Sequence, residues 1–587
     1  MADPQPQTYT DLRLFLDELR EGVEQENGKP KRRKAHKVER DVWECVYGFL
    51  RKRGEFFRAA YPYYFDQAAH ELIRVEAGGP ELLRILREMG LLDGQKHTDI
   101  VVKNLTAVGE TSPERSIHRF GYMGDRAIYI RHTRSTMFKV TPDDIEEVPL
   151  GTDGVILIAE DLPDWPGRAD LQAHIDELRP LVANTCLGLL PDLPMTKLLT
   201  TRWSQHSVFT PQQAHQMFLS WVLFPVAGSR YPLWPILVHI GPQNSGKSTP
   251  LELYIAVLRG EYVEATALPK KERDLIASAT NQSPVIYDNV DGADAREYDD
   301  LLARLATGAV VNIARLYRTN SLATFKLHNH VALTARVNPF TRSDVQRRMI
   351  VLEVAPAAGS KTVEKKPLIQ AVLSNRNAIL AEFLLRAQNI IRAHADAPER
   401  HYEFQSQMPE FEAFTLRCAE YEGTTDTCTA IWSAYKRQYE QAVTENNSLV
   451  YACRLWLGKD GNAGREVSAT TLFSELTTLY QQCDLKLPYT AASGFGRHLN
   501  EQRSALGPLG FLIISSGNNN VYAFSPSPDE ADRCRTLYRD AKEAALNRAI
   551  STLVRRNANR IEVGHYDYEG DDTSDLDSTY EKKGTVQ

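Results

Sequence analysis

A strand, a loop and a helix follow one another between residues 235 and 258, and the loop restricts the possible folds more than any other feature. Residues 235–240 form an apolar run typical of a buried strand. The pattern of residues 248–258 predicts a helix with Pro250 in its first turn, where the missing N–H costs little. The loop reads Gly-Pro-Gln-Asn-Ser-Gly-Lys-Ser-Thr, which matches the GxxxxGK[ST] pattern of a phosphate-binding loop.

The residue types in this loop fit the binding of a nucleoside triphosphate with Mg²⁺. Gly241 lets the chain turn as it leaves the strand, and Gly246 lets backbone N–H groups close around phosphate. Lys247 reaches the outer phosphates, and the Ser248 hydroxyl is placed to bind Mg²⁺. The positive end of the helix dipole points at the same anion. The candidate nucleotide-binding residues are Gly241, Asn244, Ser245, Gly246, Lys247, Ser248 and Thr249.

Length and composition exclude several classes of protein. With 587 residues the chain is too long for a single core, so about three to five domains are expected. No run approaches the roughly twenty apolar residues that cross a bilayer, and the polar N-terminus lacks the pattern of a signal peptide. The seven cysteines are scattered without a CxxC pair, which argues against a zinc site or a disulfide framework. We therefore expect a cytoplasmic protein without a membrane partner.

Changes of pattern divide the chain into seven predicted segments. They are a helix and basic linker (1–40), an α/β N-terminal domain (41–165), a helical connector (166–228), the domain of the phosphate loop (229–357), a helical segment (358–409), a second patterned domain (410–527) and a helix with an acidic, disorder-like tail (528–587). The net charge of −7 does not by itself indicate nucleic acid. The basic run 29–34 is either a solvated linker or a DNA contact. The acidic tail either keeps the chain in solution or has a DNA-mimicking or partner-binding role.

The segment 410–527 has the pattern of a winged helix. Ser468 is placed to cap a helix over residues 469–482, and Thr490 to cap another over residues 491–502. Strands are expected at residues 511–514 and 521–524, which gives the order helix, helix, hairpin. A winged helix binds either DNA or another protein. For the first alternative, the candidate DNA contacts are Arg497 and Arg503.

A second strand supplies acidic residues for the phosphate site. Residues 284–289 form an apolar run that ends in Asp288, the expected Mg²⁺-side carboxylate, which acts through a bound water. The next residue is Asn289 rather than a glutamate. Asn289 is the candidate for orienting the attacking water, and Asp291 is the candidate base. The alternative for Asp291 is a loop position without a catalytic role.

The remaining elements of the domain supply further candidates. A helix is expected over residues 298–306, and then a hairpin with strands at 310–317 and 323–327. After the strand at 330–334, Thr334 and Asn338 are alternative polar sensors between the loop and Asp288. His118 and the triplet at 328–330 are interpreted as structural, because neither has the partners of a metal or polymerase site.

Arginines precede the last strand, residues 349–354. They suit insertion into a neighbouring subunit's ATP site, where a cation stabilises charge on the γ-phosphate. Arg348 is the first candidate, ahead of Arg347 and Arg342. The alternative is a surface ion pair with Asp344.

In combination, residues 215–355 resemble the AAA+ ATPases, close to the superfamily III-like replicative DNA helicases of phages and mobile genetic elements. The resemblance depends on an ordered set of short motifs: Asp288-Asn289, Ala306-Thr307-Gly308, Arg315-Leu316-Tyr317 and Asp344 to Arg348. It implies a P-loop AAA+ core, a parallel sheet flanked by helices, that uses ATP and Mg²⁺ and assembles into a homo-oligomeric ring, a hexamer, on DNA. The absence of an acid directly after Asp288 departs from many AAA+ proteins.

The resemblance also assigns a role to the hairpin at 310–327, which would track single-stranded DNA in the pore. Its candidate contacts are Arg315, Arg318 and Lys326, and Arg315 faces either DNA or phosphate. The leading hypothesis is therefore an ATP-dependent, ring-forming DNA helicase for replication. Two alternatives remain: a regulatory or defence ATPase that switches assembly without unwinding, and a DNA-binding adaptor with a degenerate ATPase.

Overall fold

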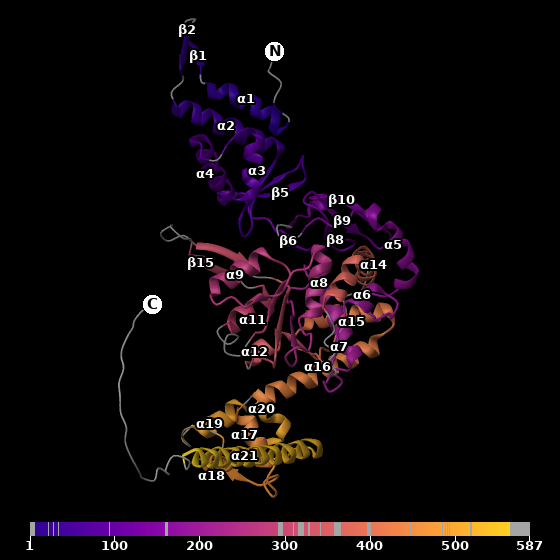
Figure 1. The fold of residues 1–587 in the computed structure, drawn as a ribbon, viewed down its shortest axis with the longest axis vertical. Helices are drawn as coiled ribbons and strands as arrows, with labels where there is room; N and C mark the ends of the chain where they lie inside the picture. Colours follow the sequence, from indigo (N-terminus) through magenta and orange to yellow (C-terminus); the bar gives the residue numbers. More distant parts are fainter. Residues whose placement is uncertain are drawn as a thin grey trace, which may run out of the picture. The chain divides into compact units, whose positions relative to one another are not determined.

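The computed structural model of the chain divides into two compact units, residues 1–441 and residues 442–587 (Figure 1). The structure describes residues 6–563 except 7, 22, 27–28, 33–34, 93, 159–162, 291–297, 309, 315–321, 327–328, 341, 357–364, 396–400, 447, 484, 486, 488, 490, 492–493 and 517–518. Helix α15 (Pro409–Glu422) lies in the first unit. Helix α16 (Thr425–Asn446) begins in the first unit and ends in the second.

The first unit is mixed α/β. Its other α-helices are α1 (Tyr9–Glu21), α2 (Ala35–Arg53), α3 (Pro80–Glu88), α4 (Lys96–Thr111), α5 (Arg168–Val182), α6 (Pro194–Leu198), α7 (Pro211–Leu223), α8 (Thr249–Arg259), α9 (Glu272–Asn281), α11 (Asp299–Thr307), α12 (Ser343–Gln346), α13 (Lys365–Ser374) and α14 (Arg376–His394). Its strands up to residue 158 are β1 (Val23–Glu26), β2 (Lys29–Arg32), β3 (Gly54–Arg58), β4 (Pro62–Asp66), β5 (Glu71–Arg74), β6 (His118–Arg119), β7 (Gly121–Met123), β8 (Ile128–Arg131), β9 (Thr136–Val140), β10 (Ile145–Pro149) and β11 (Leu157–Ile158).

A five-stranded parallel sheet carries the predicted phosphate loop. Its strands are β12 (Ile236–Ile240), β13 (Thr266–Ala267), β14 (Val285–Asp288), β17 (Val331–Ala335) and β18 (Met349–Glu353). They lie in the order β13-β14-β17-β12-β18, and every pairing is parallel. The sheet therefore extends to both sides of β12, and in such sheets ligands bind beyond the carboxyl ends of the strands, where the order reverses.

Apolar residues on alternating positions bury both faces of this sheet. Leu237 of β12 packs in one core with α7, α8 and α14, whereas Ile236 and Val238 pack in another with α9 and α11. Figure 1 shows these two sets of helices on opposite sides of the strands. Strands buried on both faces read as continuous apolar runs. The predicted parallel sheet flanked by helices is thus confirmed.

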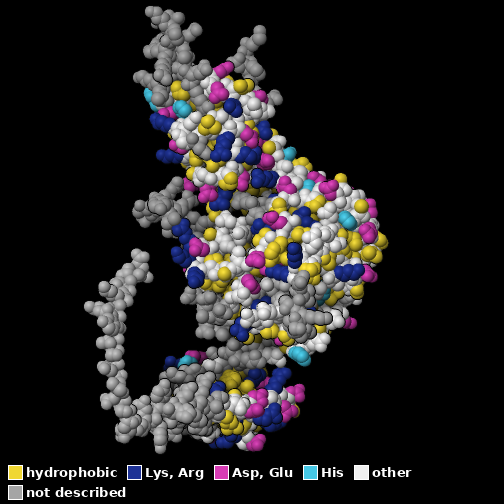
Figure 2. Space-filling model, in the orientation of Figure 1, with side chains coloured by type: hydrophobic (Ala, Val, Ile, Leu, Met, Phe, Trp, Pro, Cys, Tyr) yellow, Lys and Arg dark blue, Asp and Glu magenta, His cyan; other side chains and the backbone are white. Residues whose placement is uncertain are grey.

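The N-terminal region departs from its prediction at one point. Residues 1–40 were expected to be a helix and a linker, but β1 and β2 form an antiparallel hairpin after α1. A basic strand that contains Pro30 gives no alternating pattern, so the hairpin is not visible in the sequence. Further along, β3-β4-β5 and β10-β9-β8-β7 form two antiparallel sheets. Acidic and basic side chains are interspersed on the face of the molecule shown in Figure 2.

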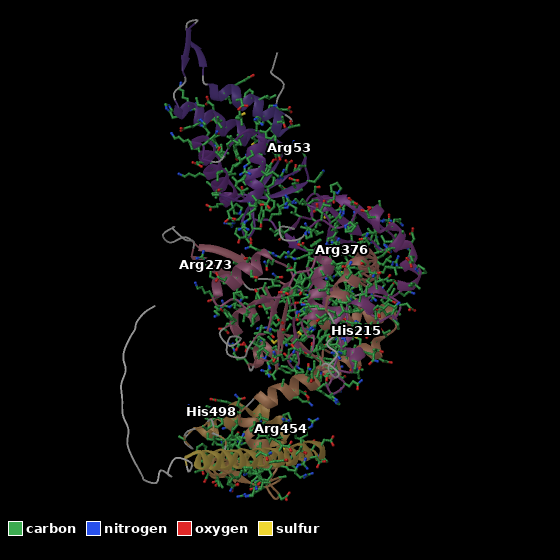
Figure 3. All side chains as sticks on the ribbon, viewed as in Figure 1. Arg53, His215, Arg273, Arg376, Arg454 and His498 are labelled. Atoms are coloured by element: carbon green, nitrogen blue, oxygen red, sulfur yellow. The ribbon has the colours of Figure 1, made fainter. Side chains whose placement is uncertain are left out.

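The second unit has a helical core beside a small sheet. It contains α17 (Ser448–Leu457), β19 (Val467–Ser468), α18 (Ala469–Gln482), α19 (Phe495–Glu501), α20 (Arg503–Leu506), β20 (Phe511–Ser516), β21 (Asn519–Phe524) and α21 (Pro528–Val563). The strands pair in the order β19-β21-β20. Arg454 of α17 forms an ion pair with Glu530 of α21 at 2.6 Å, which fixes α21 to this core (Figure 3).

The helix starts of this unit were predicted with mixed success. Ser468 caps α18 by accepting a hydrogen bond from the N–H of Thr471, as expected. The next helix was expected to begin at residue 491 behind Thr490, but α19 begins at Phe495. Gly494 precedes it with φ 96°, a left-handed conformation that interrupts a helix. Thr490 lies outside the described residues.

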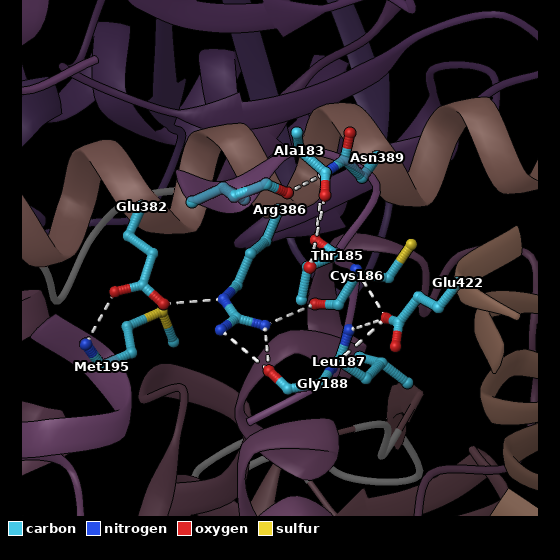
Figure 4. A network of polar contacts seen from close by, with 11 residues as sticks. Ala183, Thr185, Cys186, Leu187, Gly188, Met195, Glu382, Arg386, Asn389 and Glu422 are labelled. Atoms are coloured by element: carbon cyan, nitrogen blue, oxygen red, sulfur yellow. Dashed lines mark hydrogen bonds and ion pairs between the residues drawn. The ribbon is translucent and has the colours of Figure 1, made fainter. Parts of the chain in front are cut away.

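A polar network ties the helical connector to α14 and α15 (Figure 4). Arg386 and Glu382, one turn apart on α14, form a fully buried ion pair at 2.7 Å, and Arg386 also donates to the carbonyl oxygens of Cys186 and Gly188. Glu422 of α15 accepts hydrogen bonds from the N–H groups of three consecutive residues, Cys186, Leu187 and Gly188. The N–H groups of residues 186–188 and the carbonyl oxygens of Cys186 and Gly188 are therefore all hydrogen-bonded within the protein.

Candidate functional site

The candidate site begins with the loop that joins β12 to α8. Asn244 and Gly246 have left-handed backbone conformations, with φ 61° and 82°. A Cβ atom on Gly241 would lie 2.6 Å from the carbonyl oxygen of Val354 and 2.9 Å from Oγ of Ser245, so a side chain does not fit there. This is the tight turn expected of Gly241, and it folds the loop back over the end of its own strand.

The loop presents unpaired hydrogen-bond donors. Within the described residues, the N–H groups of Gly246, Lys247 and Ser248 have no acceptor, although they precede α8 rather than lie inside it. The hydroxyl of Ser245 is also buried without a partner. Gly246 and Ser248 are partly buried and Lys247 is buried. Successive unpaired N–H groups at a helix start form an anion site. This observation fits the residues to a phosphate group.

Lys247 supplies the cation of the site. Its side chain is 7% exposed, and no carboxylate in the described part of the chain forms an ion pair with it. Lysine is almost never buried unless it is paired. A bound anion would provide the missing partner.

Asp288, Asn289 and Thr334 form a compact hydrogen-bonded cluster. The hydroxyl of Thr334 donates to Oδ1 of Asp288 and accepts from the N–H of Asn289 at 3.0 Å. The side-chain amide of Asn289 donates to Oδ2 of Asp288 at 2.9 Å, and Asn289 has φ 53°. Both carboxylate oxygens of Asp288 are thereby oriented from one side.

The strand order brings the loop and this cluster to one edge of the sheet. Thr334 of β17 pairs with His239 of β12 on one side, and the next strand beyond it, β14, ends in Asp288. Since neighbouring strands are about 4.8 Å apart, the ends of β12 and β14 lie about 10 Å from each other. If Mg²⁺ is bound with a phosphate at this edge, Ser248 and Asp288 are the residues that would hold it.

His239 is a residue of the site that sequence reasoning missed. It is fully buried, and its ring bonds through Nδ1 to the carbonyl oxygen of Lys247 at 2.9 Å. Burial lowers the pKa of His239 to about 4, so the ring is neutral and holds Lys247 without adding charge. A polar residue within an apolar run, two positions before the loop, was the available signal.

The three candidate arginines have different surroundings. Arg342 donates to Asp344 at 2.7 Å and to Asp300 at 2.6 Å, so the alternative of a surface ion pair is the one observed for it. Arg348 is half-buried, and burial and the neighbouring Arg347 lower its pKa, whereas the charge of Asp344 raises it. Among the described residues no carboxylate forms an ion pair with Arg348, because Asp344 is bound by Arg342. Arg347 lies beside it, with its carbonyl oxygen accepting from the hydroxyl of Tyr435.

Arg348 lies at the opposite edge of the sheet from Lys247. Its carbonyl oxygen accepts a hydrogen bond from the N–H of Ile236, the first residue of β12. In a parallel sheet this edge carries the amino ends of the strands, and β18 has five residues, about 16 Å of length. Arg348 is therefore not part of its own chain's phosphate site.

Of the two sensor candidates, the structure brings Thr334 to Asp288. Asn338 instead accepts a hydrogen bond from the N–H of Phe340 at 3.1 Å, a local turn contact. Asp291 lies outside the described residues. His330 is buried and stacked on Trp221 with ring centroids 3.5 Å apart, which supports the structural interpretation of that triplet.

The predicted hairpin is confirmed as β15 (Val310–Ala314) and β16 (Leu322–Lys326), paired with Val310 opposite Lys326. Arg315 and Arg318 lie outside the described residues. In the second unit, Arg497 of α19 and Arg503, the first residue of α20, are both exposed.

No described helix is long and apolar enough to cross a membrane. No group of three or more metal-ligating His, Cys, Asp or Glu side chains occurs in the part of the chain that the structure covers.

No family model and no curated protein matches the chain. Among solved structures, the A form apo structure of the NrS-1 C terminal region is 10% identical with a TM-score of 0.34, and the match covers 82% of this chain and 98% of that one. JCV helicase with a bound acetamide compound is 14% identical with a TM-score of 0.20, over 47% of this chain and 73% of that one. At such low TM-scores and identities the likeness carries no argument about fold or activity.

Proposed function

We propose that this chain is an ATP-dependent motor of the AAA+ class that moves on DNA as a homo-oligomeric ring, a hexamer, and serves replication of a phage or mobile element. One observation carries the proposal. Lys247 and Asp288 lie at the carboxyl edge of the sheet, whereas Arg348 lies at the amino edge and forms no ion pair with a described carboxylate. A cation so placed suits the ATP site of a neighbouring subunit.

The residues of the site divide the work of phosphoryl transfer. Mg²⁺, when bound, neutralises charge on the outer phosphates. The N–H groups of Gly246, Lys247 and Ser248 hold the phosphates, and the lysine cation stabilises the charge that develops on them. Thr334 fixes the carboxylate of Asp288, and Arg348 of an adjacent subunit adds a further cation in the transition state.

Two elements are proposed to contact DNA. The β15–β16 hairpin follows α11, and the resemblance assigns it to the pore, with Lys326 at the end of β16. The second unit, as a winged-helix-like domain, presents Arg497 and Arg503 on its surface. Lysine and arginine contacts to phosphate give affinity without sequence preference.

A specific observation favours a second candidate, a nucleotide-controlled assembly switch that does not unwind. The amide of Asn289 donates to Asp288, so the position after Asp288 supplies no carboxylate to deprotonate water. Slow hydrolysis would then serve to time assembly rather than to drive movement.

The decisive experiment measures ATP hydrolysis and strand displacement together. For a helicase, single-stranded DNA stimulates hydrolysis, a forked duplex is unwound, and Lys247→Ala abolishes both. A switch would retain nucleotide-dependent assembly without displacement. If Lys247→Ala and Asp288→Ala leave every DNA-dependent property intact, the chain is an adaptor and the proposal is wrong.

A further inference from the structure

The four-stranded sheet of the N-terminal region carries a hollow of about 410 Å³. Its lining includes the rings of Tyr122 and Tyr129 and the charged side chains of Arg126, Lys139 and Asp153, none of which belongs to the candidate active site. The volume lies within the range of sites that hold small ligands. Aromatic and charged side chains around one hollow are the groups that bind a polar heterocycle.

The strand register places the main lining residues in one row. Tyr122 of β7 pairs with Tyr129 of β8, and Tyr129 pairs with Lys139 of β9. Paired residues share a face of the sheet. The neighbours Ile128 and Ile130 point to the other face, into the large core. The row is therefore held on a rigid, well-packed sheet.

Asp153 orders the polar side of the hollow. It accepts a hydrogen bond from the hydroxyl of Tyr129 and forms an ion pair with Nζ of Lys139 at 2.8 Å. Its backbone is left-handed, with φ 53°, which is costly for a residue with a side chain. The turn thus holds a strained position that brings this carboxylate to the two side chains.

The charges of the lining limit the ligand. Arg126 and Lys139 are balanced by Asp125 and Asp153, so a group with several negative charges, such as a nucleoside triphosphate, would be poorly compensated. A nucleotide within a strand carries a single phosphate charge. Tyr122 is half-buried, and its ring lies 4.4 Å from His118 and 6.2 Å from Tyr129, measured between centroids. This cluster offers a surface on which a base can stack.

We propose that this hollow holds one unstacked nucleotide of a single-stranded nucleic acid, with its base against Tyr122 and its phosphate near Arg126 and Lys139. Bases in a duplex are stacked on each other and not available to a side chain, so a duplex does not fit. The site would form a nucleic-acid contact separate from the hairpin and from the second unit.

The first test uses fluorescence anisotropy of a labelled oligothymidine with the full-length chain and no added nucleotide. Stacking on an aromatic side chain contributes about 1–3 kcal/mol per base, so Tyr122→Ala should weaken binding at least about fivefold. Tyr122→Phe keeps the ring and should bind like the unmodified chain. Tyr421→Ala, which removes a partly exposed tyrosine from α15, is the matched control and should have no effect.

A second measurement locates the contact and is independent of other DNA contacts. An oligonucleotide that contains bromodeoxyuridine should, after irradiation and digestion, crosslink to the peptide with Tyr122, and unlabelled single strand should compete better than duplex or thymidine monophosphate. The inference would be overturned if Tyr122→Ala bound the oligonucleotide with wild-type affinity and the unmodified chain gave no crosslink at the Tyr122 peptide. Competition by duplex or mononucleotide that equals competition by single strand would also overturn it. The same assays in a Lys247→Ala chain separate the proposed nucleotide site from the proposed motor. If Lys247→Ala removes ATP hydrolysis alone, the crosslink at the Tyr122 peptide persists in that chain.

Discussion

At the scale of single residues, the hydroxyl of Thr334 holds the acidic side of the candidate site together. It is fully buried, donates to Asp288 and accepts from the N–H of Asn289. Thr334→Val keeps the shape of the side chain but leaves the N–H without an acceptor, at a cost of about 1–3 kcal/mol. We expect ATP hydrolysis to fall at least about tenfold and to need more Mg²⁺, because Asp288 is no longer oriented. A titration of activity with Mg²⁺ measures both effects.

The control for this prediction is Thr334→Ser, which retains the hydroxyl and should keep most of the activity. Asn338→Ala tests the alternative sensor and should change little, since Asn338 bonds to its own turn. Loss of activity in Asn338→Ala with normal activity in Thr334→Val would reverse the assignment.

At the scale of elements, sequence reasoning succeeded where burial imposes a pattern. β12, β14, β17 and β18 are continuous apolar runs because helices cover both faces of their sheet. β13 was missed because two exposed residues, Thr266 and Ala267, carry no such pattern. The start of α19 was misplaced because a polar residue before an apolar pattern looks like a cap, whereas the backbone of Gly494 sets the actual boundary.

The candidate site was predictable to the same extent. Lys247 and Asp288 stand in recognisable local motifs, and strand order then brings them to one edge. The contact of His239 with Lys247 joins a strand to the loop that follows it, and the contact of Thr334 with Asp288 joins two strands far apart in sequence. Local sequence patterns do not identify either contact. For this reason His239 was missed, and the sequence did not decide between Thr334 and Asn338 as the sensor.

The network around Arg386 yields a prediction about how elements are held together. Arg386→Met would leave the buried carboxylate of Glu382 without its cation, and removing one partner of a buried pair costs about 3–5 kcal/mol. The double change Glu382→Leu with Arg386→Met should recover part of this loss, because no charge remains buried. Guanidinium denaturation of Arg386→Met, Glu382→Leu, the double variant and the unmodified chain gives the coupling energy. Additive losses would contradict a buried pair. Arg13→Met, in an exposed pair with Asp17 one turn further along α1, is the control.

At the scale of the whole molecule, buried histidines make the first unit the acid-sensitive one. Burial lowers the pKa of five described histidines: His215, His239 and His394 to about 4, His330 to about 3, and His132 below its usual value. In the unfolded chain these histidines take up protons below about pH 6.5, whereas in the folded unit their rings stay neutral until about pH 4. The contribution of the neutral histidines to the unfolding free energy is therefore fully present above about pH 6.5 and is lost as the pH falls toward 4. At pH 5.5 the loss is about 1.4 kcal/mol per histidine.

The second unit should respond differently, because within its described residues the single histidine is the exposed His498 (Figure 3). Hydrogen–deuterium exchange with mass spectrometry, at pH 7 and pH 5.5 after correction for intrinsic exchange rates, measures each unit separately. We expect lost protection in α7, β12 and α14 and little change in α17 and α18. His498→Gln is the control and should alter neither unit; an equal loss of protection in both units would contradict the prediction.

The position of Arg348 predicts that activity belongs to the assembly rather than to the chain. Arg348→Ala subunits retain Lys247 and Asp288, so they should bind ATP but hydrolyse it poorly, because no neighbour supplies the cation. Lys247→Ala subunits lack phosphate binding but keep Arg348. Mixing the two inactive proteins should restore turnover at interfaces that pair an intact phosphate site with an intact arginine. Arg342→Ala, which removes an arginine already paired with Asp344, should hydrolyse ATP normally. Normal hydrolysis by Arg348→Ala alone, or no recovery on mixing when native mass spectrometry detects mixed rings, would exclude a shared site.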